Sequence, residues 1–465
     1  MLEGRVFHFM GIGGVGMSGL ARLLAALGAR VTGCDLRVSE TTRSLEREGI
    51  PVWQGHDPAH LEGTEILVYS SAIRPDHPEI QAARRQGLKV WPRAEMLAEI
   101  MGWYPRSIAV AGAHGKTTTS SMIAEMLAVA GLEPTVIIGG RVNCFGSNAR
   151  LGRGEYLVAE TDESDGSFLY LQPYLAVITN VDREHLDFYA DFRAVKRAFV
   201  KFARRVSPEG ALVVCGDDPG VRTILPELSG RLVTYGFSEG AEVRGEILAE
   251  APLPRVRVWW RGQALGEFSL RVPGRHNAEN ALAAVAVGLT LGLPSAVILS
   301  ALSGFSGVGR RLEFKGEVLG AFIYDDYAHH PREIAATLAA IRALHPERRL
   351  LAVFQPHRYS RTRALWQEFV RVLAEPEVLF LTEIYPAAES PLPGVSGEKF
   401  FQAVRRVRGG KPTLFAPDLE TLRAQVEFFL SPGDLLLTLG AGDVYQLGEA
   451  LVRQISPSRK EKVVG

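Results

Sequence analysis

A short glycine-rich turn followed by lysine and threonine has the residue types of a phosphate-binding loop. The small residues at 112–115 let backbone N–H groups approach phosphate oxygens, and a helix starting behind them adds positive potential. Lys116 can reach the terminal phosphates of a nucleotide, and the Thr117 hydroxyl can ligate Mg²⁺. Val110 stands where the usual pattern has a glycine, so a plain turn between strand and helix is the alternative. We expect a nucleoside triphosphate here, and chemistry driven by phosphoryl transfer.

Another glycine-rich turn lies near the N-terminus, and we call it the first glycine turn because it comes first along the chain. Residues 11–16 fit the G-x-G-x-x-G pattern between a predicted strand and a predicted helix, and Asp35 follows at about the distance of a ribose-binding acid. By itself the pattern indicates that a diphosphate or a nucleotide binds there. A dinucleotide is the default expectation. A UDP-linked ligand uses the same physics, because glycines admit a pyrophosphate and the helix end attracts it. A tight turn without a ligand is the alternative.

Acidic residues and a histidine follow two further apolar stretches. Glu160 ends a predicted core strand, where a parallel sheet presents a Mg²⁺ ligand to a nucleotide on the neighbouring loop. We interpret Asp162, Glu163 and Asp165 as a solvated acidic loop. His185 follows another predicted strand and is either a ligand of a divalent ion or a surface histidine in a charged loop.

Two asparagines stand at the start of a predicted helix of small apolar residues. The side-chain amides of Asn277 and Asn280 can read the edge of an adenine. They can equally cap the start of the helix. Their spacing favours neither reading.

Three polar clusters follow predicted strands in the last third of the chain. Ligands of open α/β sheets bind outside the carboxyl ends of the strands, so these clusters predict a ligand site. His357, Arg358 and Arg361 together form a cationic group that suits a carboxylate or a phosphate. The clusters occupy 325–331, 355–361 and 440–442.

Apolar stretches alternate with helical ones along the chain, which predicts parallel sheets with helices on their faces. A chain of 465 residues should hold two to four domains. We place three α/β units at 1–101, 106–310 and 311–465, joined first by a linker at 102–106. Alternating Val, Arg and Trp at 234–270 predict a small β element inserted in the second unit. The predicted core strands are 5–9, 30–34, 66–69, 107–111, 155–159, 175–179, 322–324, 350–354, 378–381 and 435–439.

The composition argues against several classes of protein. Lys plus Arg and Asp plus Glu number 52 each, so no large basic field indicates a nucleic acid or an anionic membrane as partner. The three cysteines lie far apart and show neither metal-ligand spacing nor a disulfide framework, which suits a reducing cytoplasm. The uncharged stretch 281–309 is interrupted by glycine and proline, which favours two buried helices over a membrane span.

Eight sequence blocks, in their order along the chain, resemble the signature blocks of the Mur ligase family. The blocks span about 11–362, so the resemblance covers most of the chain and is weaker beyond. Their combination is far more specific than either glycine turn alone. They read GIGGVGMSGLA, SSAIRPDHPE, AGAHGKTTT, AETDESDGSF, NVDREHLDFY, PGRHNAENALA, DDYAHHP and FQPHRYSRT.

The resemblance implies a Rossmann-like N-terminal domain that binds UDP, a P-loop-type central ATPase domain and a Rossmann-like C-terminal domain that closes over the site. Lys196 matches a lysine that is carbamylated in several sister ligases, and we leave it out of the metal ligands. By resemblance, the UDP-sugar meets Gly11, Gly13, Gly14, Gly16, Asp35, Ser70 and Ser71. ATP meets Gly112, Gly115, Lys116, Thr117, Thr118, Asn277, Asn280, Arg311 and Asp326. The metal ligands are Thr117, Glu160 and His185, the substrate and amino-acid residues are Tyr327, His329, His357, Arg358, Arg361 and Ala441, and the catalytic residues are Lys116, His329, His357 and Arg358.

The blocks are most similar to those family members that join L-alanine to the lactyl carboxylate of UDP-N-acetylmuramate. The implied reaction uses ATP and Mg²⁺, or Mn²⁺, and an acyl phosphate, in cytoplasmic synthesis of peptidoglycan precursors. We expect a monomer or a weak homodimer. Three alternatives remain: a sister ligase that recycles a tripeptide onto the same sugar nucleotide, a nicotinamide-dependent oxidoreductase built on the first glycine turn, and a regulator that binds ATP without turnover.

Overall fold

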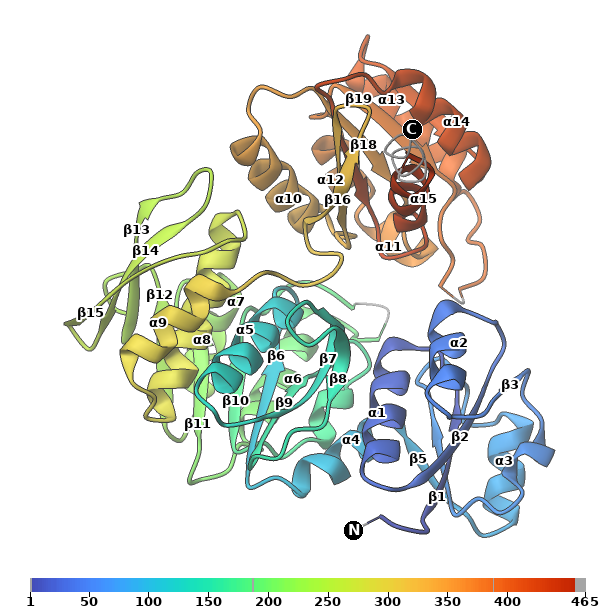
Figure 1. Ribbon diagram of the computed structural model, residues 1–465, viewed down its shortest axis with the longest axis vertical. Helices are drawn as coiled ribbons and strands as arrows, with labels where there is room; N and C mark the ends of the chain where they lie inside the picture. Colours follow the sequence, from blue (N-terminus) through green and yellow to red (C-terminus); the bar gives the residue numbers. More distant parts are fainter. Residues whose placement is uncertain (1, 186–187, 388, 456–465) are drawn as a thin grey trace, which may run out of the picture. The chain divides into compact units, whose positions relative to one another are not determined.

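The computed structural model describes residues 2–185, 188–387 and 389–455, and it holds three sheets of five, ten and six strands (Figure 1). Most neighbouring strands are parallel, and helices pack on both faces of each sheet. This architecture confirms the predicted α/β class. The final stretch of the predicted third domain, 456–465, lies outside the described residues. Two compact units result: the first holds Met1–Ala249, Pro254–Val272 and His276–Val308, and the second holds Glu250–Leu253, Pro273–Arg275 and Gly309–Gly465.

The first sheet is entirely parallel, in the order β3-β2-β1-β4-β5. Phe7 and Phe9 of β1 pack on one face with α1, α2 and α4, and Met10 packs on the other with η1 and α3. The strand order reverses at β1, so the first glycine turn sits where such sheets bind ligands. The elements are β1 (Val6–Met10), α1 (Val15–Ala26), β2 (Arg30–Asp35), α2 (Glu40–Arg47), β3 (Val52–Gln54), η1 (Pro58–Leu61), β4 (Ile66–Tyr69), α3 (Pro78–Arg85), β5 (Lys89–Pro92) and α4 (Arg93–Gly102).

The second sheet has the order β15-β14-β13-β12-β11-β10-β6-β9-β7-β8. Its strand β6 carries the phosphate turn and lies between β10 and β9. The residues that follow β9 and β10 therefore flank that turn. The elements up to β12 are β6 (Arg106–Ala111), α5 (Lys116–Val129), β7 (Thr135–Val142), β8 (Ser147–Arg150), β9 (Tyr156–Glu160), η2 (Ser167–Tyr170), β10 (Leu175–Ile178), α6 (Phe192–Ala203), β11 (Ala211–Cys215), α7 (Pro219–Ile224), η3 (Leu225–Glu227) and β12 (Leu232–Gly236).

The predicted inserted β element exists, and it continues the large sheet. Strands β13 (Val243–Ala249), β14 (Arg255–Trp260) and β15 (Gln263–Ser269) form an antiparallel meander. The meander joins the parallel part because β13 pairs with β12. Val256 and Val258 point to the core, while Arg255 and Arg257, which alternate with them, are less buried, as the alternation predicts.

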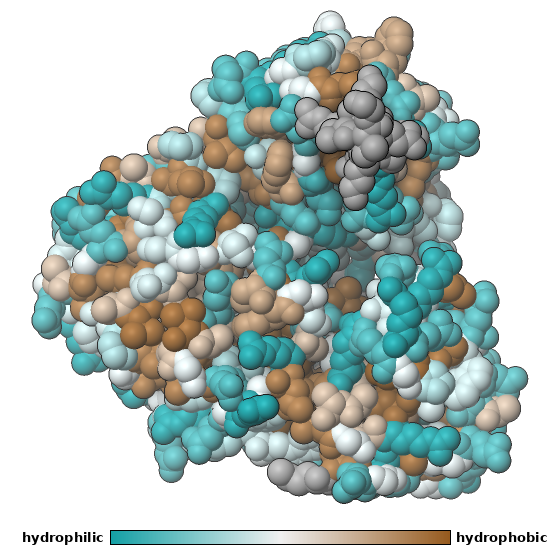
Figure 2. Space-filling view, viewed as in Figure 1, coloured by the Kyte–Doolittle hydropathy of each residue, from teal (hydrophilic) through white to brown (hydrophobic). Residues whose placement is uncertain are grey.

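The uncharged stretch forms two helices, α8 (Arg275–Thr290) and α9 (Ser295–Gly304), as predicted. Both bury apolar side chains in the same cluster as α5. In the described ranges no helix is long and apolar enough to cross a bilayer. On the face drawn in Figure 2, hydrophilic and hydrophobic residues are interspersed.

The third sheet has the order β16-β17-β21-β18-β19-β20. We expected only parallel strands here, but β16 pairs antiparallel with β17 as an edge strand. Its alternating sequence EFKGEV is only partly buried, so it lacks the apolar run that marked the other strands. The elements are β16 (Glu313–Val318), β17 (Ala321–Asp326), α10 (Pro331–Leu344), β18 (Leu350–Phe354), α11 (Tyr359–Ala364), α12 (Trp366–Val372), β19 (Val378–Thr382), α13 (Gly397–Arg408), β20 (Thr413–Ala416), α14 (Leu419–Phe429), β21 (Leu435–Leu439) and α15 (Tyr445–Ile455).

Candidate active site

Two glycines shape the turn between β6 and α5. Gly112 has φ +140°, and a Cβ built there would lie 2.0 Å from the Thr179 hydroxyl oxygen. Gly115 caps the helix with φ +80°, and its Cβ would lie 2.4 Å from the Asn280 Oδ1. The Thr179 hydroxyl also donates to the His114 carbonyl at 2.7 Å, which fastens the turn to the end of β10. Only glycine fits at both positions.

Lys116 is the first residue of α5, and its ammonium group folds back over the turn. It donates to the carbonyls of Gly112 and Ala113 and pairs with Glu163 Oε1 at 2.7 Å. Burial alone would lower the pKa of Lys116, but the carboxylates of Glu163 and Glu160 outweigh burial and raise the pKa. The lysine therefore carries a full positive charge where the sequence predicts phosphates.

Glu163 corrects our interpretation of the acidic loop as solvated. Its side chain is 2% exposed and lies between Lys116 and His185, whose Nε2 is 3.3 Å from Glu163 Oε1. Burial would raise the pKa of Glu163, but Lys116 and His185 outweigh it and lower the pKa. The local sequence looked solvated because the partner that neutralises this acid is 47 residues away. The ammonium group of a partly buried lysine is stabilised by a carboxylate beside it, and the need for such a partner was the available signal.

The residues predicted to hold a metal ion form two neighbouring groups. The Thr117 hydroxyl donates to Glu160 Oε1 at 3.0 Å, and Gly139 N donates to Glu160 Oε2 at 2.7 Å. His185 belongs instead with Glu163 and Glu184, and one ligand atom from each of these three lies within 4.8 Å of the others.

The donor set fits a divalent cation. Carboxylate and hydroxyl oxygens are the ligands that Mg²⁺ prefers, and Thr117 and Glu160 supply them side by side. A second observation supports the fit: Glu163 Oε2 is buried and has no hydrogen-bond partner within the described part of the chain. Such an oxygen is available to a cation or to a water bound to it.

Asn280 lies against the phosphate turn. It is buried on α8, accepts a hydrogen bond from Thr119 Oγ1 at 3.3 Å, and its Nδ2 donates to Asn277 Oδ1 at 3.4 Å. Thr118, also predicted for ATP, is buried in the first turn of α5. The geometry thus couples both asparagines to the start of α5, and their contact with adenine stays a prediction.

The first glycine turn is organised by Asp35. Its Oδ2 accepts Gly13 N at 2.9 Å, so this carboxylate shapes the turn directly. Gly11 has φ +75°, and its Cβ would lie 3.1 Å from the Cβ of Ser70. Ser71 is exposed next to Ser70, directly after β4. Gly14 caps α1, and a Cβ on Gly16 would lie 3.0 Å from Arg93 Nη1. The structure therefore brings the predicted UDP-binding residues to one edge of the first sheet.

In the domain of the third sheet, Asp326 is the last residue of β17, and Tyr327 and His329 follow it in the loop. Asp326 accepts backbone N–H groups of Leu312 and Ala328, each at 2.7 Å. The rings of Tyr327 and His329 meet edge to face with centroids 5.3 Å apart.

Arginines surround the Tyr327 ring. The guanidinium carbon of Arg311 lies 5.2 Å from the ring centroid. Arg310, which the sequence did not single out, lies 5.0 Å from the same ring. Arg310 also donates to the carbonyls of Gly440 and Gly442, which flank the half-buried Ala441.

The structure brings together the residues of the cationic group that we predicted after β18. Arg361 Nη1 donates to His357 Nδ1 at 3.2 Å, and the His357 ring stacks on Tyr385 with centroids 5.5 Å apart. Arg358 adopts φ +70°, and its N–H donates to the Tyr385 carbonyl at 2.8 Å. Burial, together with Arg361 and Arg358, lowers the pKa of His357 to about 3, and burial holds the pKa of His329 well below its ordinary value. Both imidazoles are therefore neutral at pH 7.

Asp326 makes a pH-dependent contribution to stability. Burial raises its pKa to about 6, against the opposing effect of Arg311 and the backbone N–H groups, whereas an unfolded aspartate has a pKa of about 3.9. The folded state therefore binds the proton more tightly. This contribution, about 3 kcal/mol, is complete below about pH 4 and is lost as the pH rises through about 6.

We expect Asp326→Asn to remove this component from the dependence of the unfolding free energy on pH. Urea denaturation of wild type and variant across that pH window measures the difference between them, in which the other titrating groups cancel. Parallel curves for the two proteins would contradict the prediction.

Three family models match successive parts of the chain. The model described as Mur ligase family, catalytic domain matches residues 6–104. The Mur ligase middle domain matches residues 110–288, and the model described as Mur ligase, glutamate ligase domain matches residues 310–442. Together they span most of the chain.

Curated proteins and solved structures are similar over nearly the whole length. The UDP-N-acetylmuramate–L-alanine ligase of Oleidesulfovibrio alaskensis is 50% identical over 448 residues, 96% of this chain and 98% of that protein. The ligase of the same name from Solidesulfovibrio magneticus is 50% identical over 444 residues, 96% and 97% of the two chains. The solved UDP-N-acetylmuramate-alanine ligase from Thermotoga maritima is 29% identical, with a TM-score of 0.84 over 97% of this chain and 99% of that one. A murein peptide ligase from Psychrobacter arcticus, 22% identical over 97% and 98% of the two chains with a TM-score of 0.75, shares the fold.

Proposed function

The chain belongs to the Mur ligase family, and from that membership we propose that it joins L-alanine to the lactyl carboxylate of UDP-N-acetylmuramate with ATP, in the synthesis of peptidoglycan precursors. The observation that carries the proposal is the charged, partly buried Lys116 at the start of α5, beside the Thr117–Glu160 pair. Relatives that bear the name of this reaction are 50% identical over nearly the whole chain, which supports the choice of substrates.

The reaction needs ATP because a carboxylate has no viable leaving group for an amine to displace. In the proposed route the lactyl carboxylate attacks the γ-phosphorus of ATP, so ADP leaves and an acyl phosphate forms. The α-amine of L-alanine then attacks the acyl carbon and loses a proton, and inorganic phosphate leaves. Both steps depend on alignment of the reacting groups, which a bound complex supplies.

Lys116 would stabilise the charge that spreads over the transferred phosphoryl group. Its ammonium donates to the turn carbonyls and to Glu163. Phosphate oxygens can replace those carbonyls while Glu163 keeps the ammonium in place. The lysine is thus held near its working position before ATP arrives, which lowers the reorganisation needed in the transition state.

Of the residues that we predicted for Mg²⁺, Thr117 and Glu160 would hold it in one group, and His185, next to Glu163 and Glu184, would hold it in the neighbouring group. Bound there, the ion neutralises phosphate charge that would otherwise repel the attacking carboxylate. The chain's own contribution is orientation, because Gly139 N fixes the second oxygen of Glu160.

The sugar nucleotide would bind at the first glycine turn, with its pyrophosphate at the start of α1. Gly11, Gly13, Gly14 and Gly16 form the turn, and Asp35 holds it through Gly13 N. Ser70 and Ser71 follow β4 at the same edge of the sheet. We propose the ribose as the partner of Asp35 once the ligand displaces its backbone contact.

The muramate carboxylate and alanine would contact residues in the domain of the third sheet. Arg358 and Arg361 suit carboxylates, and burial together with their charge keeps His357 neutral. A carboxylate bound to the two arginines would offset their part in lowering the pKa of His357. A neutral imidazole is the form that can take the proton of the ammonium group. His329, Tyr327 and Ala441 complete this proposed site.

The proposed division of labour follows the predicted domains. The unit at 1–101 binds the UDP-sugar, 106–310 binds ATP with Asn277 and Asn280 near the adenine, and 311–465 contributes Arg311 and Asp326 to the ATP and binds the amino acid. We propose a cytoplasmic protein that acts as a monomer or a weak homodimer.

We expect phosphate release to require all three substrates. With UDP-N-acetylmuramate, ATP and Mg²⁺ but no L-alanine, turnover should fall at least ~100-fold, because the acyl phosphate has no acceptor and water is a poorly placed nucleophile. A coupled assay measures the rate of phosphate release, and mass spectrometry identifies the nucleotide product.

Separate arms of the same assay distinguish the rivals. Tripeptide in place of alanine tests the recycling ligase, and absorbance after addition of NAD(P)H tests an oxidoreductase. Full-speed ATP hydrolysis without any amino acid would argue against a ligase, and ATP binding without phosphate release would favour a regulator.

A further inference from the structure

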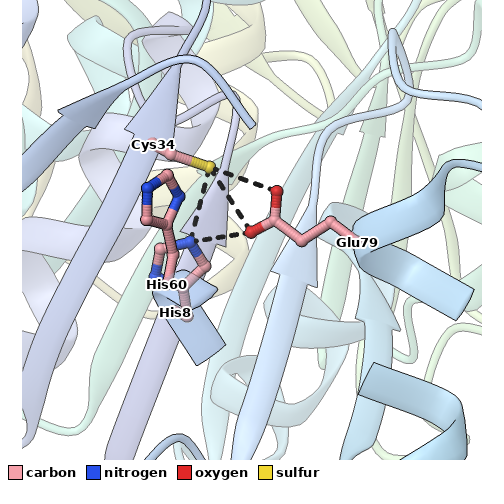
Figure 3. Close-up of side chains that lie close together, drawn as sticks. All are labelled: His8, Cys34, His60 and Glu79. Carbon is pink, nitrogen blue, oxygen red and sulfur yellow. Dashed lines mark hydrogen bonds and ion pairs between the residues drawn. The ribbon is translucent and has the colours of Figure 1, made fainter. Parts of the chain in front are cut away.

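Four side chains of the types that ligate metal ions lie close together inside the domain of the first sheet (Figure 3). They are His8 of β1, Cys34 of β2, His60 of η1 and Glu79 in the first turn of α3, here called the His8 cluster. His8, Cys34 and Glu79 are completely buried. This group could not be predicted from the sequence, because its members come from four elements and lack the short spacing of metal motifs.

Apolar side chains border the cluster on one side. Met10, Leu67 and Ile80 pack around Cys34 on the face of the sheet that η1 and α3 cover. Within the described ranges, the Glu79 carboxylate meets His8, His56 and Cys34, and no lysine or arginine. A buried carboxylate whose partners are imidazoles and a thiol needs a proton or a cation to neutralise it, so this environment can hold a cation next to Glu79.

The distances among the ligand atoms match the edges of a tetrahedron around a metal ion. His8 Nε2 lies 3.4 Å from Cys34 Sγ and 3.2 Å from Glu79 Oε1, and the sulfur lies 3.7 Å from the same oxygen. A tetrahedral Zn²⁺ with bonds of about 2.0 Å to N or O and about 2.3 Å to S places its ligands ~3.3–3.6 Å apart. A ring nitrogen of His60 completes the group, with all four atoms within 4.8 Å of one another.

The outer contacts orient the imidazole of His8 for ligation. Thr32 Oγ1 donates to the Phe7 carbonyl at 3.4 Å and lies 2.9 Å from His8 Nδ1. When the hydroxyl proton goes to this carbonyl, Thr32 Oγ1 accepts the Nδ1–H of His8. In the neutral ring this places the Nε2 lone pair toward Cys34 and Glu79. A backbone-anchored partner of this kind is what fixes metal-bound histidines.

His60 gives a second, independent sign. Its Nδ1 is buried and has no hydrogen-bond partner among the described residues, and its ring stacks on Trp53 with centroids 5.0 Å apart. In a plain hydrogen-bond network Cys34 would donate to Glu79 and His8 would bind Thr32, yet His60 would stay unsatisfied. A metal ion accounts for the convergence of His60 on the other three.

We propose that the His8 cluster binds one transition-metal ion, with Zn²⁺ the best match to a thiolate, two imidazoles and a carboxylate. Binding displaces the thiol proton of Cys34 to solvent, and no oxidation state changes. The ion would act on structure, because the Cys34 carbonyl accepts the backbone N–H groups of Gly11 and Ile12 at 2.8 and 3.1 Å. It would thereby stiffen the first glycine turn. His56, whose Nδ1 lies 3.0 Å from the sulfur, is the nearest substitute ligand.

The test is metal content and spectroscopy of the full-length chain. Purified protein, dialysed with excess Mg²⁺ to fill the central site, should hold about one Zn²⁺ per chain by mass spectrometry. Replacement by Co²⁺ should give tetrahedral d–d bands and a thiolate-to-cobalt band, and Trp53 emission should change. Cys34→Ser should lose the thiolate band, and Cys34→Ser and His8→Gln should each weaken Zn²⁺ binding at least ~10-fold.

Cys215→Ser is the matched control, because Cys215 is also buried at the end of a strand but lies in the second sheet. It should keep both the metal and the thiolate band. Circular dichroism in the metal-free state checks that Cys34→Ser folds like the wild type. Wild type that takes up no Zn²⁺ or Co²⁺, or a Cys34→Ser variant with unchanged affinity and spectrum, would overturn the proposal.

Discussion

Lys116→Met is expected to abolish ligation, with kcat falling about 10³-fold or more. The ammonium of Lys116 is partly buried and charged, and it lies over the turn between β6 and α5. Removing one preorganised positive group from a phosphoryl-transfer site removes stabilisation that exists mainly in the transition state. Initial rates of phosphate release with all three substrates measure the effect, and kcat should change far more than the KM for L-alanine.

A second variant separates catalysis from folding. Lys116→Met alone leaves Glu163 buried without its main partner, which costs about 3–5 kcal/mol. The double variant Lys116→Met/Glu163→Gln removes both charges, so its unfolding free energy should recover toward the wild type while its activity stays lost. Near-normal ligation by either variant would remove Lys116 from its proposed role. Recovery of activity in the double variant would show that stability, and not phosphate chemistry, was at stake.

The fold could be predicted in most of its elements because core strands of parallel sheets are short apolar runs. β4, β18 and β21 begin and end where the sequence predicts. The helix-forming run at 121–129 predicts only the later part of helix α5, which begins at Lys116. The hydroxyls of Ser120 and Ser121 bond back to helix carbonyls, so the polar threonine and serine run before it is helical too.

The candidate site could be predicted where a motif is local and not where it depends on distant partners. The glycines of the phosphate turn and Lys116 lie within a few residues of one another, so the local sequence is enough to predict them. Glu163 becomes a site residue only because the fold brings it to Lys116, and Arg310 only because it reaches the carbonyls after β21. Cys34 shows the same limit, since its neighbours His8 and Glu79 approach it through β1 and α3. Sequence spacing carries no trace of such contacts.

Gly115→Ala is expected to reduce kcat/KM for ATP about 100-fold, whereas Gly131→Ala should change it by less than about threefold. The two glycines flank the same helix, α5, with nearly equal left-handed conformations, φ +80° and φ +75°. Alanine therefore pays the same backbone strain at both sites, about 1–2 kcal/mol. They differ in surroundings: a Cβ at 115 would lie 2.4 Å from Asn280 Oδ1, and a Cβ at 131 would meet nothing within 4 Å.

The pair isolates the contact from the strain. Asn280 is buried and tied to Thr119, so it cannot yield freely, and the first turn of α5 must shift instead. A shift of that turn misplaces the backbone N–H groups and Lys116 relative to the phosphates, and a displacement near 1 Å is enough for a loss of this size. In thermal unfolding, backbone strain should lower the stability of both variants by a similar amount. The steric clash with Asn280 should lower the stability of Gly115→Ala further. Equal activity of the two variants would mean that the turn does not hold ATP in the way we propose.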